Sequence, residues 1–216
     1  MFLDIALDSA GELAQRREVA AYLAAAFDRD LFLDEALARV DSRDAGDRQV
    51  AALLLGAPGN LRAVFPLVAL LDDPAVDVRR AAVRGLAGIR DHRVLSFLLG
   101  VLDRDDELVA TTLNALTVFE LDSTRPLFDL YLDSADHETS LAALGAFRFA
   151  PSAIAAPRAV RFLTHAEPRL RSLAVSILEQ SGQRRFLEPL FPLLGDPDTR
   201  VRQLAHEAIA AIRAAR

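Results

Sequence analysis

The sequence contains no cysteine, no lysine and no tryptophan, and all of its 25 basic residues are arginine. The lack of cysteine excludes disulfide bonds, thiolate nucleophiles and thiolate metal ligands, and the lack of lysine excludes Schiff-base chemistry. No apolar run approaches the roughly 18–20 residues that cross a membrane, and the N-terminal segment is acidic where a signal peptide is basic. The formal net charge of −6 gives no uniform attraction to nucleic-acid phosphates. We therefore expect a cytoplasmic protein.

A repeat is the strongest feature that the sequence does contain. The phrase DPAVDVRRAAVRGLAGI at 73–89 recurs as DPDTRVRQLAHEAIAAI at 196–212, and weaker copies give a period of about 31 residues. In each copy a small residue lies four positions before a large aliphatic one. This spacing predicts an amphipathic helix with a small-residue face against which a neighbour packs closely. The small residues are Ala51, Ala82, Thr112, Ser140, Ala174 and Ala205, and the large ones are Leu55, Leu86, Leu116, Leu144, Leu178 and Ile209.

A second apolar segment precedes most of these helices and predicts a first helix in each unit. The segments are 65–71, 95–102, 126–132, 157–163 and 188–194. Prolines fit best in the first turn of a helix, which is where we expect Pro66, Pro126, Pro157 and Pro189, whereas Pro192 lies one turn further in. Acidic residues that precede a proline are expected to cap the second helices. These residues are Asp73, Glu167 and Asp196.

Together these patterns predict an all-α protein, a right-handed α-solenoid of about seven helix pairs whose second helices line a concave inner face. No Gly/Ser linker or block of charge interrupts the repeats. We therefore expect residues 1–216 to form a single domain, with residues 1–30 as a degenerate opening unit.

The chain resembles the HEAT-repeat family, specifically the short bacterial HEAT-like repeats of the phycobilisome-lyase type. The resemblance is carried by the phrase D-x-x-V-R-x-x-A-x-x-A-L-x-x-I around Val78, Arg79, Ala82 and Leu86 and again at 201–212. It implies an armadillo-like scaffold. Such repeats serve mainly as binding surfaces, so the resemblance implies no particular chemistry.

A column that is basic in six of seven units follows the start of the second helices, and acidic residues stand before it. The column predicts a ladder of Asp–Arg pairs between neighbouring turns, with a row of anion-binding arginines as the alternative. The column contains Arg17, Arg48, Arg79, Val109, His137, Arg171 and Arg202, and the acidic residues are Asp72, Asp73, Asp103, Asp133, Glu167 and Asp196.

Three other functions have partial support in the sequence. The pairs His137-Glu138 and His206-Glu207 invite comparison with deoxyhypusine hydroxylase, a HEAT-like di-iron enzyme, but they differ in register, so we expect no metal, no cofactor and no catalytic residue. Residues 148–216 carry 11 arginines and six acidic residues, and this basic C-terminal part is the alternative site for nucleic acid, as in the HEAT-like alkylpurine DNA glycosylase.

A phycobilin lyase or other ligand-handling subunit is the remaining alternative, because the chain has the size and repeat type of such lyases. Seven phenylalanines lie between 119 and 191 and could line an apolar groove, although filling of the core explains them better. They are Phe119, Phe128, Phe147, Phe149, Phe162, Phe186 and Phe191.

The leading prediction is a non-enzymatic scaffold that binds another protein on the concave face of its second helices. A surface that runs from basic through acidic to mixed needs a partner with a patterned charge. The residues predicted to bind the partner are Arg80, Arg84, Asn114, Thr117, Glu138, Ser172, Ser176, Glu179, Gln203, His206 and Glu207.

The C-terminal repeat is also a candidate for self-association. The sequence stops at Arg216, within the second helix of a well-formed unit, which leaves an apolar flank that we expect to be an interface. The residues on that flank are Leu190, Leu194, Leu204, Ala208 and Ala211.

Overall fold

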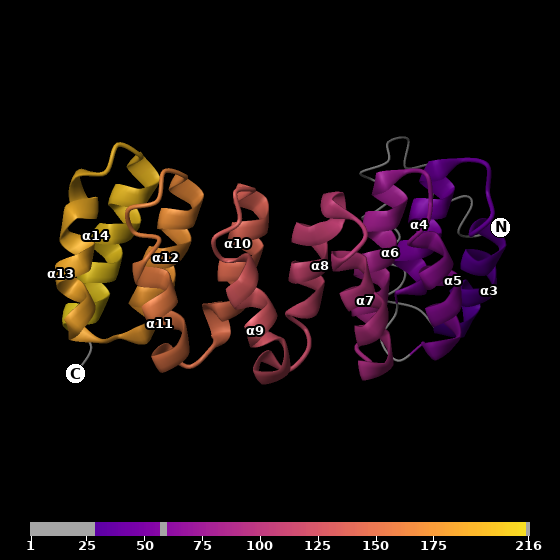
Figure 1. The fold of residues 1–216 in the computed structure, drawn as a ribbon, viewed down its shortest axis with the longest axis horizontal. Helices are drawn as coiled ribbons and strands as arrows, with labels where there is room; N and C mark the ends of the chain where they lie inside the picture. The colour runs from indigo at the N-terminus through magenta and orange to yellow at the C-terminus, as the bar shows by residue number, and fades with distance from the viewer. Residues whose placement is uncertain (1–28, 57–59, 215–216) are drawn as a thin grey trace. The chain divides into compact units, whose positions relative to one another are not determined.

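A computed structural model describes residues 29–56 and 60–214 of the chain, and these residues form helices and no strand. The chain divides into two compact units, unit 1 up to Phe119 and unit 2 from Glu120. Figure 1 shows successive helices stacked side by side within each unit. None of the described helices combines the length and the apolar character needed to cross a membrane. The opening unit predicted at residues 1–30 lies almost entirely outside the described residues, and the prediction of a single domain stays a prediction.

Unit 1 contains three described helix pairs. Each first helix packs against the second helix of its pair, and α6 packs against both α4 and α8, so the second helices form a continuous layer. The pairs are α3 (Arg29–Arg39) with α4 (Ala45–Leu55), α5 (Val64–Leu70) with α6 (Val76–Ile89), and α7 (Leu95–Leu102) with α8 (Val109–Leu116). Short 3-10 turns, η1 (Leu61–Ala63), η2 (His92–Val94) and η3 (Asp106–Leu108), lead into α5, α7 and α8.

Unit 2 repeats this plan with α12 in contact with both α10 and α14. Its pairs are α9 (Leu121–Tyr131) with α10 (His137–Gly145), α11 (Ser152–Val160) with α12 (Pro168–Ser181), and α13 (Leu187–Leu190) with α14 (Thr199–Ala214). The 3-10 segments are η4 (Ala146–Phe149), η5 (Arg184–Phe186) and η6 (Phe191–Gly195). The predicted all-α repeat fold is confirmed.

The two predicted columns of the second helices are buried, which confirms the repeat register. All six small residues are at most 1% exposed, and the six aliphatic residues are at most 6% exposed. Burial of a large aliphatic side chain stabilises by roughly 1.5–3 kcal/mol. The aliphatic column therefore supplies much of the core, while the small column sets how closely the helices approach.

The backbones of α4 and α6 approach closely where glycines lie on α6 and just after α4. A Cβ atom added to Gly85 would lie 2.6 Å from the carbonyl oxygen of Ala52, and one added to Gly88 would lie 2.2 Å from that of Gly56. No side chain larger than hydrogen fits at these distances. The backbones of α4 and α6 are therefore in direct contact.

Two of the predicted proline positions are wrong. Pro66 and Pro189 are the third residues of their helices, as expected, but Pro126 and Pro157 lie inside α9 and α11. Both helices begin about one turn earlier than the apolar pattern indicates. Their first turns carry mostly polar or small residues, so the apolar pattern does not detect them. Pro192 marks the change from α13 to the 3-10 segment η6, since a proline cannot donate the next helical hydrogen bond.

The predicted capping role is confirmed only for Glu167, which accepts a hydrogen bond from the Arg169 N–H at the start of α12. The N-cap of α6 is Ala75, and Asp198 caps α14 by accepting bonds from two backbone N–H groups. Asp73 and Asp196 lie two residues before these caps. Their carboxylates accept the N–H two residues further on and an arginine, so they shape the turn rather than the helix end.

Candidate functional site

The arginines at the start of the second helices share one local geometry. In each case Nη1 donates to the backbone carbonyls six and five residues upstream, over 2.6–3.4 Å, and so closes the turn that leads into the helix. The arginines are Arg48, Arg79, Arg171 and Arg202. This geometry explains why the column recurs in the sequence, because the turn carbonyls have no helical partner.

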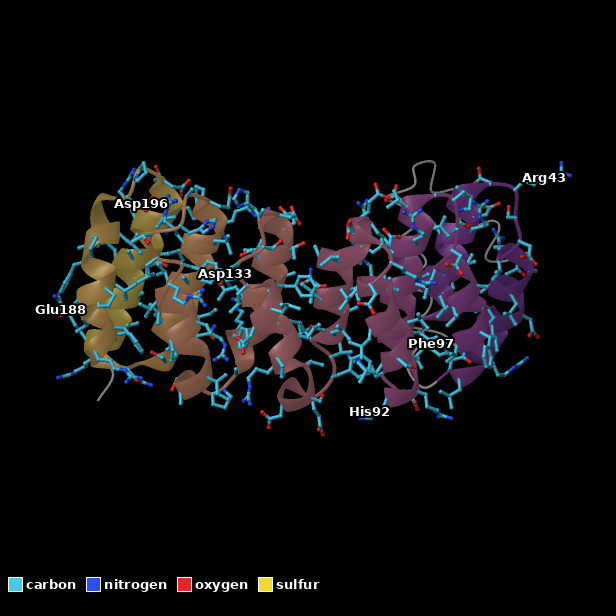
Figure 2. All side chains as sticks on the ribbon, in the orientation of Figure 1. Arg43, His92, Phe97, Asp133, Glu188 and Asp196 are labelled. Carbon is cyan, nitrogen blue, oxygen red and sulfur yellow. The ribbon has the colours of Figure 1, made fainter. Side chains whose placement is uncertain are left out.

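Two of these arginines bind the acidic turn of the following helix pair through two hydrogen bonds. Arg48 contacts Asp73 at 2.6 and 3.0 Å, and Arg171 contacts Asp196 at 2.8 and 2.6 Å. Figure 2 labels Asp196 at the loop end of unit 2. The predicted ladder is confirmed at these rungs. Arg17 lies outside the described residues.

The remaining rungs differ from the prediction. Arg79 binds Asp105 at 2.7 Å and also Glu107, whereas the sequence favoured Asp103. Asp105 accepts the N–H two residues on, as Asp73 does, so the turn geometry selects it. In place of an arginine rung, His137 contacts the ring of His165 edge-on, with ring centroids 5.5 Å apart.

Two other predicted acidic residues contact arginines that lie just after the first helices. Asp72 binds Arg104 at 3.0 Å, and Asp133 binds Arg161 at 2.6 Å. Both pairs are largely exposed, and such pairs contribute roughly 0–1 kcal/mol.

Burial is the largest single influence on Asp73 and Asp196 and would raise their pKa values, but the hydrogen bonds from Arg48 and Arg171, the backbone N–H bonds and the attraction of the nearby arginines together outweigh it, so both pKa values lie below the ordinary range. The bonds between the side chains also raise the pKa of the two arginines. Both aspartates are therefore charged at neutral pH, and they lose their charge only in acid. Arg48, Arg79 and Arg171 therefore serve the fold, whereas Arg202 contacts two turn carbonyls and the Thr199 hydroxyl and no carboxylate in the described part of the chain.

The residues predicted to bind a partner lie on the exposed side of the second helices, and most of their contacts are local. Arg84, Asn114, Thr117, Glu138, Gln203, His206 and Glu207 are exposed, and Arg80, Ser172, Ser176 and Glu179 are half-buried. Arg80 contacts Asp77 at 3.3 Å, and Gln203 contacts Glu207 at 2.9 Å within the same helix. Glu138 forms an ion pair with Arg169, which links α10 to α12.

A pocket of about 350 Å³ opens on this side of unit 1, between α6 and α8. It brings together two predicted residues, Arg84 and Asn114, and leaves out Arg80 and Thr117. Six residues complete the lining, namely Ala87, Gly88 and Arg90 from α6 and its end, and Thr111, Ala115 and Val118 from α8 and the turn after it.

Arg90 is a pocket residue that the sequence analysis missed. It lies just after α6 in the left-handed region, with φ 54°, and is the one non-glycine residue with positive φ in the described part of the chain. The same position after α12 is Gly182, with φ 63°. A non-glycine residue in this region costs roughly 1–2 kcal/mol. The signal available in the sequence was an arginine where a helix end usually carries glycine.

Neither Arg84 nor Arg90 contacts a carboxylate among residues 29–56 and 60–214. The nearby acidic groups already have partners, because Asp91 binds Arg93 at 2.8 and 2.9 Å and Asp77 binds Arg80. Arg93 also holds the pKa of Asp91 well below its usual range. The pocket therefore combines two unpaired cations with apolar walls at Ala87, Ala115 and Val118.

The phenylalanines of residues 119–191 fill the core rather than line a groove. Five are at most 9% exposed, and Phe191 is 40% exposed beneath the guanidinium of Arg213. The five buried residues are Phe119, Phe128, Phe147, Phe162 and Phe186. The side chain of Phe149 lies outside the described set.

The histidine pairs do not come together in the structure. His137 and His206 are both exposed, on α10 and α14. In the described part of the chain, no three His, Asp or Glu side chains gather in a way that could hold a metal ion.

The C-terminal flank is only partly apolar at the surface. Leu190 and Ala208 are fully buried, Leu194 and Leu204 are half-buried, and Ala211 is exposed. Self-association through this repeat stays a prediction.

Residues 33–117 match the sequence model of HEAT repeats, and several solved structures share the fold. A chain of the CpcE–CpcF complex of phycocyanin lyase from Nostoc sp. PCC7120 is 20% identical with a TM-score of 0.56, covering 96% of this chain and 92% of that one. An archaeal HEAT-like repeats protein from Thermococcus onnurineus NA1 is 17% identical with a TM-score of 0.57, covering 99% and 97%. A designed armadillo repeat protein in complex with the peptide (KR)4 is 20% identical with a TM-score of 0.56, covering 83% and 99%. No curated protein sequence matches the chain.

Proposed function

Because this chain is built of HEAT-like helical repeats, we propose that it is a non-enzymatic scaffold that binds a partner protein on the exposed side of its second helices. The observation that carries the proposal is the pocket between α6 and α8, a hollow lined by charged, polar and apolar side chains. Such a mixture gives affinity through apolar contact and specificity through charge. One neighbour in fold binds a peptide, and another is part of a two-protein complex.

Nucleic-acid binding by the basic C-terminal part has less support. Arg158, Arg161, Arg169 and Arg171 all form ion pairs with acidic residues, which leaves fewer cations for phosphates. A ligand-handling function also has less support, because the phenylalanines that could line a groove are mostly in the core.

Site-specific photo-crosslinking in cells of the native host tests the proposal. Benzoylphenylalanine replaces Thr117 or Gln203 on the second helices, or Ser96 or Glu188 on the first helices, and all four positions are exposed. Figure 2 labels Glu188 on the outer side of α13. We expect one partner to be crosslinked from Thr117, Gln203 or both and not from the first-helix positions. Crosslinking of a partner only from Ser96 or Glu188, or from none of the four positions, would contradict the proposal.

A further inference from the structure

The pocket between α6 and α8 has the composition of a carboxylate-binding site. Arg84 and Arg90 both line it, and neither has a carboxylate partner in the described part of the chain. Guanidinium groups bind carboxylates through paired hydrogen bonds and prefer them to neutral acceptors. Both arginines line one hollow in a chain of net charge −6, whereas Arg80 and Arg93 each have a nearby aspartate as partner.

The walls of the pocket indicate what accompanies the carboxylate. Val118 is 47% exposed, and Ala87 and Ala115 close the pocket on the helix side. Asn114 donates its amide to the Ala110 carbonyl, so its side-chain oxygen stays available to accept a bond. The pocket therefore suits an aliphatic side chain next to a carboxylate, together with a backbone N–H that can bond to Asn114.

The backbone at Arg90 gives a second, independent observation. The chain adopts a left-handed conformation there that favours glycine, and the equivalent end of α12 has Gly182. Non-glycine residues at strained backbone positions often have a function that is separate from stabilising the fold. The role that the surroundings offer Arg90 is to contribute charge to the pocket.

We propose that the α6–α8 pocket binds an acidic peptide segment, with Arg84 and Arg90 holding a carboxylate and Val118 contacting a neighbouring aliphatic side chain. The inference rests on the proposed scaffold function and specifies the chemistry of its partner. A peptide is favoured over nucleic acid because the pocket has no aromatic residue on which a base could stack and only two cations, whereas nucleic-acid sites use stacking platforms and many phosphate contacts.

Fluorescence anisotropy with the full chain tests the proposal. The probes are fluorescein-labelled ten-residue peptides, one alternating Glu and Val and one alternating Lys and Val, and a labelled ten-nucleotide oligothymidine. We expect the Glu-Val peptide to bind and the other two probes not to bind, with an affinity that falls as salt rises. The Nε–H signals of Arg84 and Arg90 should shift in NMR spectra of arginine-labelled protein when the Glu-Val peptide is added.

Three variants locate the binding site. Arg84→Gln and Arg90→Gly should each weaken binding of the Glu-Val peptide by about tenfold. Arg90→Gly should leave the melting temperature unchanged or raised, because glycine suits the backbone there, so its loss of binding has no origin in unfolding. Arg43→Gln is the matched control, since Arg43 is an exposed arginine of unit 1 outside the pocket (Figure 2), and it should change affinity by less than twofold.

The proposal is overturned if the Glu-Val peptide does not bind at millimolar concentration, if both pocket variants keep full affinity, or if oligothymidine binds more tightly through the same arginines. Any of these results, combined with partner crosslinks from Thr117, would leave the scaffold function standing and remove only the acidic peptide. Crosslinks confined to the first helices would instead remove the scaffold interface itself.

Discussion

Arginine–aspartate pairs in this protein differ mainly in how far they are removed from water. The side chains of Arg171 and Asp196 are 8% and 4% exposed, whereas those of Arg161 and Asp133 are 53% and 70% exposed. Water screens the exposed pair and leaves little net attraction. In the buried pair, removal of one charge leaves the other without a partner and without water to solvate it, which destabilises the fold.

Replacement of Arg171 by methionine should therefore destabilise the protein by about 3–5 kcal/mol, since it leaves Asp196 buried without a counter-charge and frees two turn carbonyls. The matched change Arg161→Met should cost no more than about 1 kcal/mol. Urea unfolding followed by circular dichroism measures both values. Equal effects of the two substitutions would show that burial does not set the strength of these pairs.

Acid should weaken the fold through the same aspartates. The pKa values of Asp73 and Asp196 are lowered in the folded chain, so their stabilisation is complete above the ordinary aspartate pKa of about 3.9 and is lost as the pH falls through the lower folded values. We expect the urea midpoint to fall between pH 5 and pH 2.5, and to fall less in the double variant Asp73→Asn/Asp196→Asn. A midpoint of the parent chain that does not change over this range would refute the assignment.

At the scale of the helix, glycine is required where α4 and α6 touch and is replaceable where a helix faces open space. A methyl group on Gly85 would meet the Ala52 carbonyl oxygen at 2.6 Å and Leu67 Cδ2 at 2.7 Å, whereas one on Gly100 of α7 would meet nothing within 4 Å. Gly85→Ala should therefore destabilise by about 1–3 kcal/mol through overpacking. Gly100→Ala should stabilise by about 0.5–1 kcal/mol, because alanine favours the helix. Thermal melting of both variants checks the opposite signs.

The helices that the sequence predicts best are the second helices, because their pattern is set by contact with two neighbours. Small residues such as Ala82 and Ala205 recur where helices approach, and the structure buries every one of them. The first helices α9 and α11 were placed one turn too late. Their early turns are polar or small, so hydrophobic periodicity could not detect them, and Pro126 and Pro157 suggested a start that the backbone does not have.

The sequence predicts those pocket residues that follow the helix periodicity and misses those placed by the backbone conformation of a turn. Arg84 and Asn114 were predicted because they occupy regular positions on their helices, and the structure brings them to one hollow. Arg90 was missed because its place depends on a left-handed turn after α6. The rung at Asp105 was missed for a related reason, since backbone bonding in the turn, and not sequence spacing, decides which acidic residue faces Arg79.

At the scale of the whole molecule, the helix pairs of each unit contact their immediate neighbours, so stability should be a sum of local terms. Ala82 lies in the α4–α6–α8 layer of unit 1, and Ala205 lies against α12 in unit 2, both with no exposed surface. A leucine at either position should overpack its own layer by about 1–3 kcal/mol. The loss of stability should stay within the unit that carries the substitution.

Native-state hydrogen exchange can follow that loss helix by helix. Ala82→Leu should lower the protection of α4, α6 and α8 and leave α12 and α14 at the level of the parent chain, while Ala205→Leu should do the reverse. Each variant is the control for the other, because the chemical change is the same and only the unit differs. If either substitution lowers protection equally in both units, the chain unfolds as one cooperative domain, as its uninterrupted repeats predict, and the separation into two compact units has no energetic counterpart.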